Sequence, residues 1–222
     1  MNKLSVTGLI KSFGTAKVLD NISFNLQTGD ILGIFGRNGS GKSTMLKVLF
    51  GTVKANAITV HLNNKLLKTT HVIPNGVIGY LPQDPFLPNN LKVRNVIPMY
   101  FKESDLQDKI FYASGISKIT DTKVGSLSMG ELRYLELLLV GNLNHPFLML
   151  DEPFSMIEPL YKERIKEFLN ELKTTKGIIL TDHYYKDVLS ISTSNIILKN
   201  GNITTANNES ALRAEGYLPE LP

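Results

Sequence analysis

Residues 36–44 read Gly36-Arg37-Asn38-Gly39-Ser40-Gly41-Lys42-Ser43-Thr44. This run matches the pattern G-x-x-x-x-G-K-[ST], which is typical of loops that bind phosphate groups. Its glycines let backbone N–H groups turn toward an anion without a clash from a Cβ atom. The pattern predicts that Lys42 reaches the β- and γ-phosphates of a nucleotide and that the Ser43 hydroxyl binds Mg²⁺.

The residues on either side of this loop favour a strand–loop–helix unit. The apolar run 31–35 precedes the loop, and the run 45–49 follows it. A helix that begins near Lys42 would point the positive end of its dipole at the same phosphates. A chance glycine-rich turn would have no need of such flanks, so the sequence predicts a nucleotide-binding site.

The composition is that of an ordinary globular protein. The chain has 222 residues, of which 42% are hydrophobic and 20% charged, and it contains no cysteine. The lack of cysteine excludes a disulfide framework and thiolate metal sites. The net charge of +4 comes from scattered Lys and Arg residues, which disfavours nucleic-acid binding. No apolar signal segment follows Met1, and the longest apolar stretch, residues 135–140, falls far short of the ~20 residues that a membrane span needs.

A second motif begins at Pro146, where the apolar run 147–150 leads into Asp151 and Glu152. Such a run fits a central parallel strand that delivers two carboxylates to the carboxyl edge of a sheet. Buried carboxylates are costly unless they are paired or bound to a metal ion. An Asp opposite the phosphate loop holds Mg²⁺ in P-loop NTPases, and the adjacent Glu can act as a base or orient water.

Four further residues are ambiguous when each is considered alone. Phe13 stands beside a turn glycine, and Gln83 and His183 each follow the end of an expected strand. Ser128 precedes an apolar helix and has Glu131 three residues later, which is the capping-box pattern. Taken singly, these residues indicate a core aromatic ring, a surface amide, a histidine bonded to the backbone and a helix cap.

The order of these motifs resembles that of the ATP-binding cassette (ABC) ATPases over about residues 3–203. The matches are Phe13 for the aromatic A-loop position, residues 36–44 for Walker A, Gln83 for the Q-loop, residues 127–131 for the L-S-G-G-Q signature, residues 147–152 for Walker B with the catalytic glutamate, and His183 for the switch histidine. A Walker A motif alone indicates some P-loop NTPase. The signature-like segment between Gln83 and Walker B is what favours the cassette family.

This resemblance implies an α/β fold: a P-loop NTPase core with a mixed or parallel sheet, an N-terminal antiparallel β subdomain and an inserted helical subdomain. We expect one domain over residues 1–222. The core and the β subdomain would take up about residues 1–83 and 127–205. The helical subdomain would cover about residues 84–126, where apolar residues recur at helical spacing, and the tail would cover about residues 206–222.

The resemblance also implies the site residues. Those that would contact ATP are Phe13, Val18, Gly36, Arg37, Asn38, Gly39, Ser40, Gly41, Lys42, Ser43, Thr44, Gln83, Ser128 and Gly130. Ser43, Gln83 and Asp151 would bind Mg²⁺. Catalysis would rest on Lys42, Glu152 and His183, with Glu152 polarising the attacking water and His183 contacting the γ-phosphate.

Three positions depart from the family pattern. Met129 replaces the first glycine of the signature, Glu131 replaces its glutamine, and Glu158 stands where the family usually has Asp in the D-loop. Met129 puts a long side chain where backbone should approach the γ-phosphate bound by a partner cassette. These departures put tight dimerisation and the full hydrolysis rate in question, and they leave nucleotide binding untouched.

The function implied by the resemblance is ATP hydrolysis in a multi-chain ABC transporter. A second ABC ATPase chain would pair head to tail with this one, as a homodimer or heterodimer with ATP between them. An integral membrane permease subunit would dock at the helical subdomain and the Q-loop and hold the chain at the cytoplasmic face of the membrane. Two alternatives remain: a non-transport cassette ATPase, for example of the iron–sulfur assembly type, and a poorly hydrolysing nucleotide-binding module.

Overall fold

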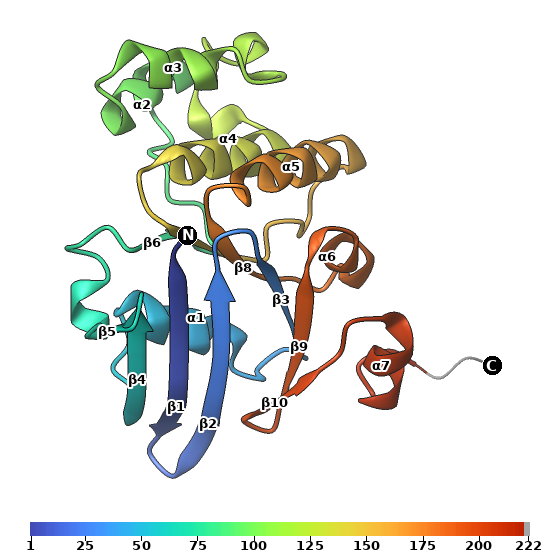
Figure 1. The fold of residues 1–222 in the computed structure, drawn as a ribbon. Coiled ribbons are helices and arrows are strands. Elements are labelled where there is room, and N and C mark those ends of the chain that lie inside the picture. The colour runs from blue at the N-terminus through green and yellow to red at the C-terminus, as the bar shows by residue number, and fades with distance from the viewer. Residues whose placement is uncertain (220–222) are drawn as a thin grey trace.

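Strand β3 (Ile31–Phe35), which leads into the 36–44 loop, lies inside the larger of two sheets (Figure 1). The computed structural model describes residues 1–219. The strand order of this sheet is β10 (Asn202–Thr205), β9 (Ser194–Lys199), β3, β8 (Gly177–Thr181), β7 (Phe147–Asp151) and β6 (Ile78–Leu81). Strand β10 runs antiparallel to β9, and the other neighbours are parallel. Every residue of β3, β7 and β8 is buried, which explains their continuous apolar runs.

The smaller sheet is antiparallel and is built from the N-terminal part of the chain. Its strand order is β2 (Ala16–Gln27), β1 (Lys3–Phe13), β4 (Ala57–Leu62) and β5 (Lys65–Leu66). Asn63 and Asn64 join β4 to β5 with φ angles of 50° and 64°. Asparagine tolerates this left-handed conformation, which suits the tight turn of a hairpin.

Two hydrophobic cores hold the sheets and helices together. Helix α1 (Lys42–Phe50) contributes Met45 and Leu46 to a core that also contains residues of β1, β3 and β7, so this core joins the two sheets. The second core lies against the opposite face of the larger sheet. It is covered by α4 (Met129–Asn142), α5 (Pro159–Leu172), α6 (Tyr185–Ile191) and α7 (Glu209–Ala214). The expected α/β class, with a mixed sheet, an antiparallel sheet and packed helices, is confirmed.

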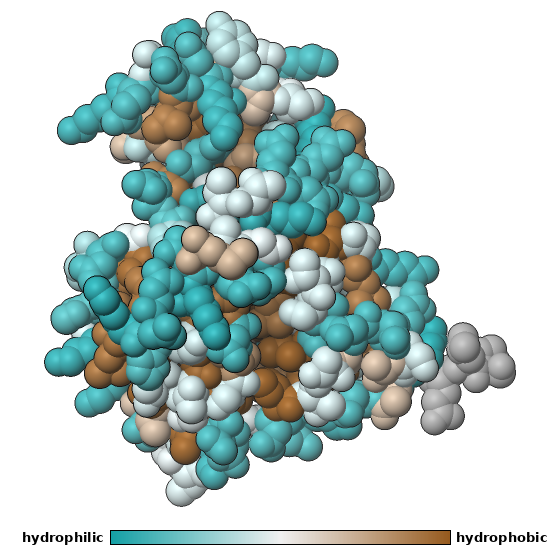
Figure 2. Space-filling model, viewed as in Figure 1, coloured by the Kyte–Doolittle hydropathy of each residue, from teal (hydrophilic) through white to brown (hydrophobic). Residues whose placement is uncertain are grey.

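Residues 84–126 form α2 (Val93–Tyr100), α3 (Ser104–Phe111) and short 3₁₀ turns at Ile116–Lys118 and Val124–Ser126. A further 3₁₀ turn, Thr69–His71, precedes β6. Figure 1 shows α2 and α3 beyond α4, on the side away from the sheets. In Figure 2, hydrophilic residues cover most of the visible face, and hydrophobic ones also reach the surface among these upper helices. No helix within residues 1–219 is both long enough and apolar enough to cross a membrane.

The segment after β10 is more ordered than a polar tail. Ala206 and Leu212 are completely buried, and the Asn208 side chain caps α7 by accepting a hydrogen bond of 2.9 Å from the Ala211 N–H. Ala211, Tyr217 and Leu218 also pack against the core, but these apolar residues do not recur at a recognisable period. The last part of the expected tail, residues 220–222, lies outside the described residues.

A buried polar pair, His145 and Lys176, lies where β7 begins. The Lys176 ammonium donates hydrogen bonds of 2.9 Å to the Leu143 carbonyl and 2.6 Å to the His145 carbonyl. His145 Nε2 lies 2.8 Å from the Val140 carbonyl, and its Nδ1 lies 3.4 Å from the ammonium. Burial, helped by the positive charge of Lys176, lowers the pKa of His145 to about 4. The imidazole is therefore neutral at physiological pH.

This lowered pKa predicts a loss of stability in mild acid. Between pH 6.5 and 4 the unfolded chain binds a proton that the folded protein does not, so the free energy of unfolding falls as pH falls through that window. The full shift corresponds to at most about 3 kcal/mol. Urea unfolding at about pH 7.5 and about pH 4.5 gives the free energy of unfolding at each pH. This free energy should fall less in acid for His145→Gln than for the parent, and the glutamine amide can still donate to the Val140 carbonyl. Equal losses in both proteins would contradict the assignment.

Candidate active site

The loop of residues 36–44 has the tight backbone that its glycines predict. A Cβ atom on Gly36 would come within 2.4 Å of Ser40 Oγ and 2.8 Å of the Leu198 carbonyl oxygen. Gly39 and Gly41 have φ angles of 78° and 107°, which side chains rarely allow. The loop therefore turns tightly just before α1, in a conformation that side chains at these positions would not allow.

The start of α1 offers N–H groups to an anion. The first hydrogen bond of the helix runs from the Met45 N–H to the Gly41 carbonyl at 2.8 Å. The N–H groups of residues 42–44 therefore have no acceptor within the helix. Free N–H groups at a helix N-terminus, together with the helix dipole, form a phosphate-binding arrangement.

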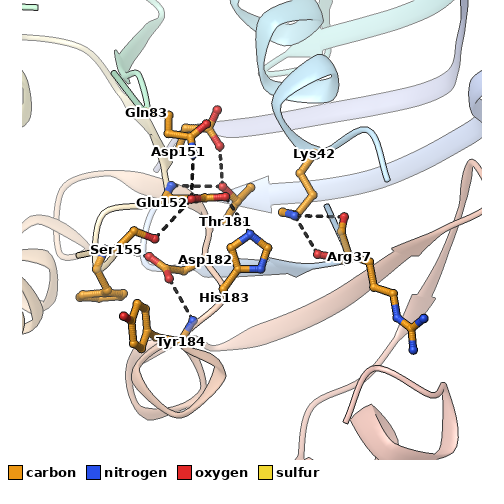
Figure 3. Close-up of polar contacts among 12 residues, drawn as sticks. Arg37, Lys42, Gln83, Asp151, Glu152, Ser155, Thr181, Asp182, His183 and Tyr184 are labelled. Atoms are coloured by element: carbon orange, nitrogen blue, oxygen red, sulfur yellow. Dashed lines mark hydrogen bonds and ion pairs between the residues drawn. The ribbon is translucent and has the colours of Figure 1, made fainter. Parts of the chain in front are cut away.

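Lys42 is buried beneath this loop, with 6% of its surface exposed. Its ammonium donates hydrogen bonds of 2.7 Å to the Gly36 carbonyl and 3.5 Å to the Arg37 carbonyl. Burial lowers the pKa of Lys42, and the nearby carboxylates of Glu152 and Asp151 oppose that shift. The cation is thus held by the loop itself and faces the carboxylates across the site (Figure 3).

A cavity of about 440 Å³ opens above the loop. Small-molecule sites in proteins commonly measure about 300–1,000 Å³. The residues that line it are Val18, Asn38, Gly39, Ser40, Gly41, Lys42, Ser43, Thr44, Gln83 and Glu152. Ser40 Oγ is buried without a hydrogen-bond partner among the described residues, so it is a polar atom to which a bound group could bond. The cavity walls fit a polyphosphate.

Glu152 is the centre of a cluster of side chains from three separate segments (Figure 3). His183 Nε2 lies 2.9 Å from Glu152 Oε1. The Gln83 amide donates to Glu152 Oε2 at 2.9 Å, and the Ser155 hydroxyl donates to the same oxygen at 3.3 Å. Both carboxylate oxygens are therefore oriented, which is what a group that must position water requires.

The backbone at Glu152 is held in an uncommon conformation. Its φ angle is 54°, in the left-handed region that residues other than glycine rarely adopt. The Glu152 N–H donates to the Thr181 carbonyl at 2.9 Å, which fixes this turn against the end of β8. Such strained positions cluster at functional sites, where the surrounding structure maintains them.

Asp151 lies one residue earlier and only 2% of it is exposed. The Thr181 hydroxyl donates to one carboxylate oxygen at 2.8 Å, and the Tyr80 hydroxyl donates to the other at 3.2 Å. Burial and the neighbouring Asp151 carboxylate raise the pKa of Tyr80, so its hydroxyl stays a donor. Asp151 is therefore a fixed buried carboxylate at the sheet edge.

The oxygen atoms of Ser43, Gln83 and Asp151 suit a magnesium ion that is also bound by phosphates. Within residues 1–219, no group of three or more His, Cys, Asp or Glu side chains is arranged to hold a metal ion. Mg²⁺ in phosphate-transfer sites is usually bound by one or two protein oxygens, by waters and by the substrate phosphates. The Ser43 hydroxyl, the Gln83 amide oxygen and the Asp151 carboxylate are the kind of ligands that such an ion takes.

Five expected nucleotide contacts are not among the residues that line this cavity: Gly36 and Arg37 at the start of the loop, and Phe13, Ser128 and Gly130. Phe13 ends β1, is 54% exposed, and has Lys11 Nζ 4.4 Å from the centre of its ring. Ser128 and Gly130 lie at the start of α4 and do not line the cavity either. Within a single chain the structure thus gathers the loop, Gln83, Glu152 and His183, and it leaves the signature segment apart from them.

The signature segment forms the predicted capping box. The Glu131 N–H donates to Ser128 Oγ at 3.2 Å, and the Ser128 N–H donates to the Glu131 carboxylate at 2.8 Å. Met129 begins α4 and is 46% exposed. A Cβ atom on Gly130 would come within 2.4 Å of a Glu158 carboxylate oxygen, so Glu158 lies directly against the signature backbone.

The sequence did not single out two aromatic side chains near the site. Tyr80 shows its role only through the pairing of β6 with β7, which places it beside Asp151. The Tyr217 ring lies 5.5 Å from the ring of Phe35, and Arg37 donates to the neighbouring Gly216 carbonyl at 3.0 Å. The C-terminal segment is therefore in contact with the phosphate loop, and no motif in the sequence indicates this.

The comparisons with known sequences agree with this geometry. A family profile described as ABC transporter matches residues 19–155. An uncharacterised ABC transporter ATP-binding protein of Methanocaldococcus jannaschii is 32% identical over 208 residues, which cover 90% of this chain and 75% of that protein. The lipopolysaccharide export system ATP-binding protein LptB of Acidithiobacillus ferridurans is 28% identical over 214 residues, which cover 91% of this chain and 89% of LptB.

Solved structures show the same likeness. A nucleotide-free ATP-binding cassette from an ABC transporter has a TM-score of 0.83 at 25% identity, over 99% of this chain and 96% of the other. The ADP conformation of MJ1267, another cassette of an ABC transporter, has a TM-score of 0.80 at 25% identity, over 99% of this chain and 100% of the other. The similarity therefore extends along the whole chain and is not confined to the phosphate loop.

Proposed function

The chain belongs to the ABC transporter family, and on that premise we propose that it is the ATP-hydrolysing subunit of a transporter built from several chains. The observation that carries this proposal is the meeting of Gln83, Glu152 and His183, at hydrogen-bond distance, beside the phosphate loop. These three residues are far apart in the sequence. Their convergence on a loop that offers N–H groups and a buried ammonium fits the hydrolysis of a nucleoside triphosphate.

The residues in and around the cavity divide into those that would hold ATP and those that would act on it. The N–H groups of residues 42–44 and the Lys42 ammonium would bind the phosphates, and Val18 lines the same cavity. Phe13, exposed at the end of β1, would stack on the adenine. Ser43, Gln83 and Asp151 would hold Mg²⁺, which neutralises charge on the phosphates.

Hydrolysis would proceed by attack of water on the γ-phosphorus. Glu152 would accept the proton of the water as the new P–O bond forms and the bond to the β–γ bridging oxygen breaks, giving ADP and phosphate. The His183 imidazole and the Gln83 amide, each 2.9 Å from a Glu152 oxygen, orient that carboxylate. His183 would also contact the γ-phosphate. Such catalysis consists mainly of positioning and charge stabilisation.

A second cassette chain, the same or different, would complete each site. Ser128 is exposed and separate from the cavity of its own chain, so it is available to a nucleotide on a head-to-tail partner, whereas Gly130 behind it is buried against Glu158. Met129 projects from the start of α4 on the surface that such a partner would approach. A long side chain there would keep a partner's phosphates away from the helix N-terminus.

We therefore expect Met129→Gly to strengthen dimerisation in the presence of ATP. Relief of a steric conflict is worth roughly 1–3 kcal/mol, so the dimer dissociation constant should fall by about 10-fold or more. Analytical ultracentrifugation with ATP, in a background that carries Glu152→Gln to preserve the nucleotide, measures this constant. Met99→Gly, at another exposed methionine, is the matched control. An unchanged or weaker dimer would contradict the steric role of Met129.

The membrane partner would dock beside Gln83. Phe86, three residues beyond Gln83, is 38% exposed, and Met99 on α2 is 65% exposed, so apolar side chains are available near this segment. The helical segment 84–126 and the Gln83 loop would receive a permease subunit and hold the chain at the cytoplasmic face of the membrane. The names of its relatives favour such a transport role over the two alternatives, a non-transport cassette ATPase and a nucleotide sensor.

Two measurements test the proposal. Phosphate release from ATP and Mg²⁺ by the isolated chain, measured with malachite green, should exceed that of the Glu152→Gln variant. Release at the level of the variant would instead favour the nucleotide sensor. Affinity purification from detergent-solubilised membranes should recover a multi-span membrane protein together with the chain. Recovery of soluble partners alone would favour the non-transport cassette.

A further inference from the structure

We propose that Arg133 and Glu136, a buried ion pair on α4, are positioning residues that hold the Gln83 and Glu152 side chains in the relative positions that hydrolysis requires. The proposal rests on the proposed ATPase function and assigns two residues to it that no motif includes. The pair joins three parts of the molecule: the signature helix, the segment around Gln83 and the carboxyl end of β7.

The Arg133 guanidinium bridges two strand ends. Its Nη1 donates to the Pro82 carbonyl and its Nη2 donates to the Asp151 carbonyl. Pro82 is the residue immediately before Gln83, and Asp151 is the residue immediately before Glu152. A single planar group therefore fixes the backbone just ahead of both side chains that meet in the site. A lysine ammonium could not reproduce this two-pronged contact, because it lacks the rigid fork.

Glu136 holds the other side of the Gln83 segment. Its carboxylate accepts a hydrogen bond of 2.9 Å from the Phe86 N–H, and its second oxygen lies 3.5 Å from Arg133 Nη1. The segment from Pro82 to Phe86 is thus attached at both ends to the same helix. Gln83, between these attachments, reaches Glu152 at 2.9 Å.

The burial of this pair argues against a role in stability alone. Glu136 is completely buried and Arg133 is 5% exposed, on a helix whose other buried side chains are almost all apolar. Burial raises the pKa of Glu136 and lowers that of Arg133, which shows the cost of keeping both charges out of water. Well-packed apolar residues in place of such a pair are often as stable or more stable. What apolar residues could not supply is the hydrogen bonds to Pro82, Phe86 and Asp151.

The pair also links the site to the signature segment. Arg133 and Glu136 lie on α4, whose first turn carries the capping box of Ser128 and Glu131. A shift of the Gln83 segment would therefore displace the start of α4, and a shift of α4 would displace Gln83. Glu152, with its strained backbone, would follow through the Asp151 carbonyl.

The decisive variant combines Arg133→Met with Glu136→Leu, which removes the pair while keeping the site apolar and filled. We expect its melting temperature to stay close to that of the parent, because the relieved cost of burying two charges offsets the loss of the hydrogen bonds to three backbone groups. Its kcat for ATP should fall about 10- to 100-fold, because a small misplacement of catalytic groups costs up to about that much. KM should change by less than about threefold. Tyr134→Phe, at an equally buried residue of α4, is the control and should retain the parent kcat.

A cycle with Gln83→Ala separates positioning from a general loss of structure. If the pair acts through Gln83, the double substitution should lower kcat by a clearly smaller factor in the Gln83→Ala background than in the parent. Equal costs in both backgrounds would overturn the proposal, as would a double variant that keeps the parent kcat.

Hydrogen exchange makes the outcome independent of catalysis. The backbone amides of Gln83, Asp84, Phe86 and Leu87 should exchange faster in the double variant than in the parent and in Tyr134→Phe. If the parent chain hydrolyses no ATP, the proposed function fails, yet this exchange still reports on the attachment of the segment. Unchanged exchange in the double variant would mean that Arg133 and Glu136 do not hold the Gln83 segment.

Discussion

Replacing Glu152 with glutamine is expected to slow ATP hydrolysis by about 10²–10⁴-fold, the usual scale for the loss of a positioned base. Glutamine keeps the size of the side chain and one oxygen acceptor, so the contacts with Gln83 and His183 can persist in part. It cannot accept the proton of the attacking water. The substitution leaves the phosphate loop, the proposed nucleotide-binding element, unchanged. ATP affinity should therefore stay within about threefold of the parent value.

The two effects are measured separately. Single-turnover phosphate release gives the rate, and titration with a fluorescent ATP analogue gives the affinity. Glu163→Gln, at an exposed glutamate of α5, is the matched control and should change neither. Parent-like turnover of the Glu152→Gln variant would remove Glu152 from the mechanism, and a large loss of affinity would mean that it belongs to the binding site instead.

Replacing Lys42 with methionine should abolish most nucleotide binding. The Lys42 ammonium lies under the phosphate loop with 6% of the residue exposed, so its charge is poorly screened by water. A hydrogen bond to a charged group contributes about 1.5–3 kcal/mol, and the loss of two such bonds to phosphates would weaken ATP binding by about 100-fold or more. Methionine preserves the length of the apolar stem, so the packing of α1 should be retained.

Isothermal titration calorimetry with ATP and Mg²⁺ measures this affinity. Lys47→Met provides the control, because Lys47 lies on the same helix and is exposed. The control should bind ATP as the parent does. An unchanged affinity in Lys42→Met would show that the ammonium does not face the phosphates, and the assignment of residues 36–44 as the nucleotide loop would fail with it.

The phosphate loop was predictable because its geometry is local. Gly36, Gly39 and Gly41 impose their backbone conformations within nine residues of sequence, and Gly51 ends α1 with a φ angle of 88°. The capping box of Ser128 and Glu131 is equally local. Hydrogen bonds between residues three or four positions apart depend on the immediate sequence and hardly at all on the rest of the fold.

The cluster around Glu152 was only half predictable. The apolar runs before Asp151 and His183 indicated buried parallel strands, and the carboxyl ends of such strands share one edge. The adjacency of β7 and β8 and the 2.9 Å contacts of Glu152 with His183 and Gln83 came from the tertiary structure. The ATP contacts all stay predictions, and among them Phe13, Ser128 and Gly130 do not line the cavity.

Two features had no usable signal in the sequence. The C-terminal segment appeared polar, yet Leu212 is buried in the core and Tyr217 packs on Phe35. The run after residue 131 appeared to be a simple apolar helix, yet Arg133 and Glu136 within it bond to Pro82, Phe86 and Asp151. A charged residue on an apolar helix face shows its purpose only when its distant partners are known.

By itself, the sequence determined the phosphate-loop pattern, the helix caps and the buried strands, because these depend on short-range patterns, and its resemblance to the cassette family implied the α/β class. Only the tertiary structure decided which of those residues touch. Contacts such as Gln83 with Glu152 join positions 69 residues apart. They depend on the strand order of the sheet and on the packing of α4 against it, and no spacing along the chain encodes either.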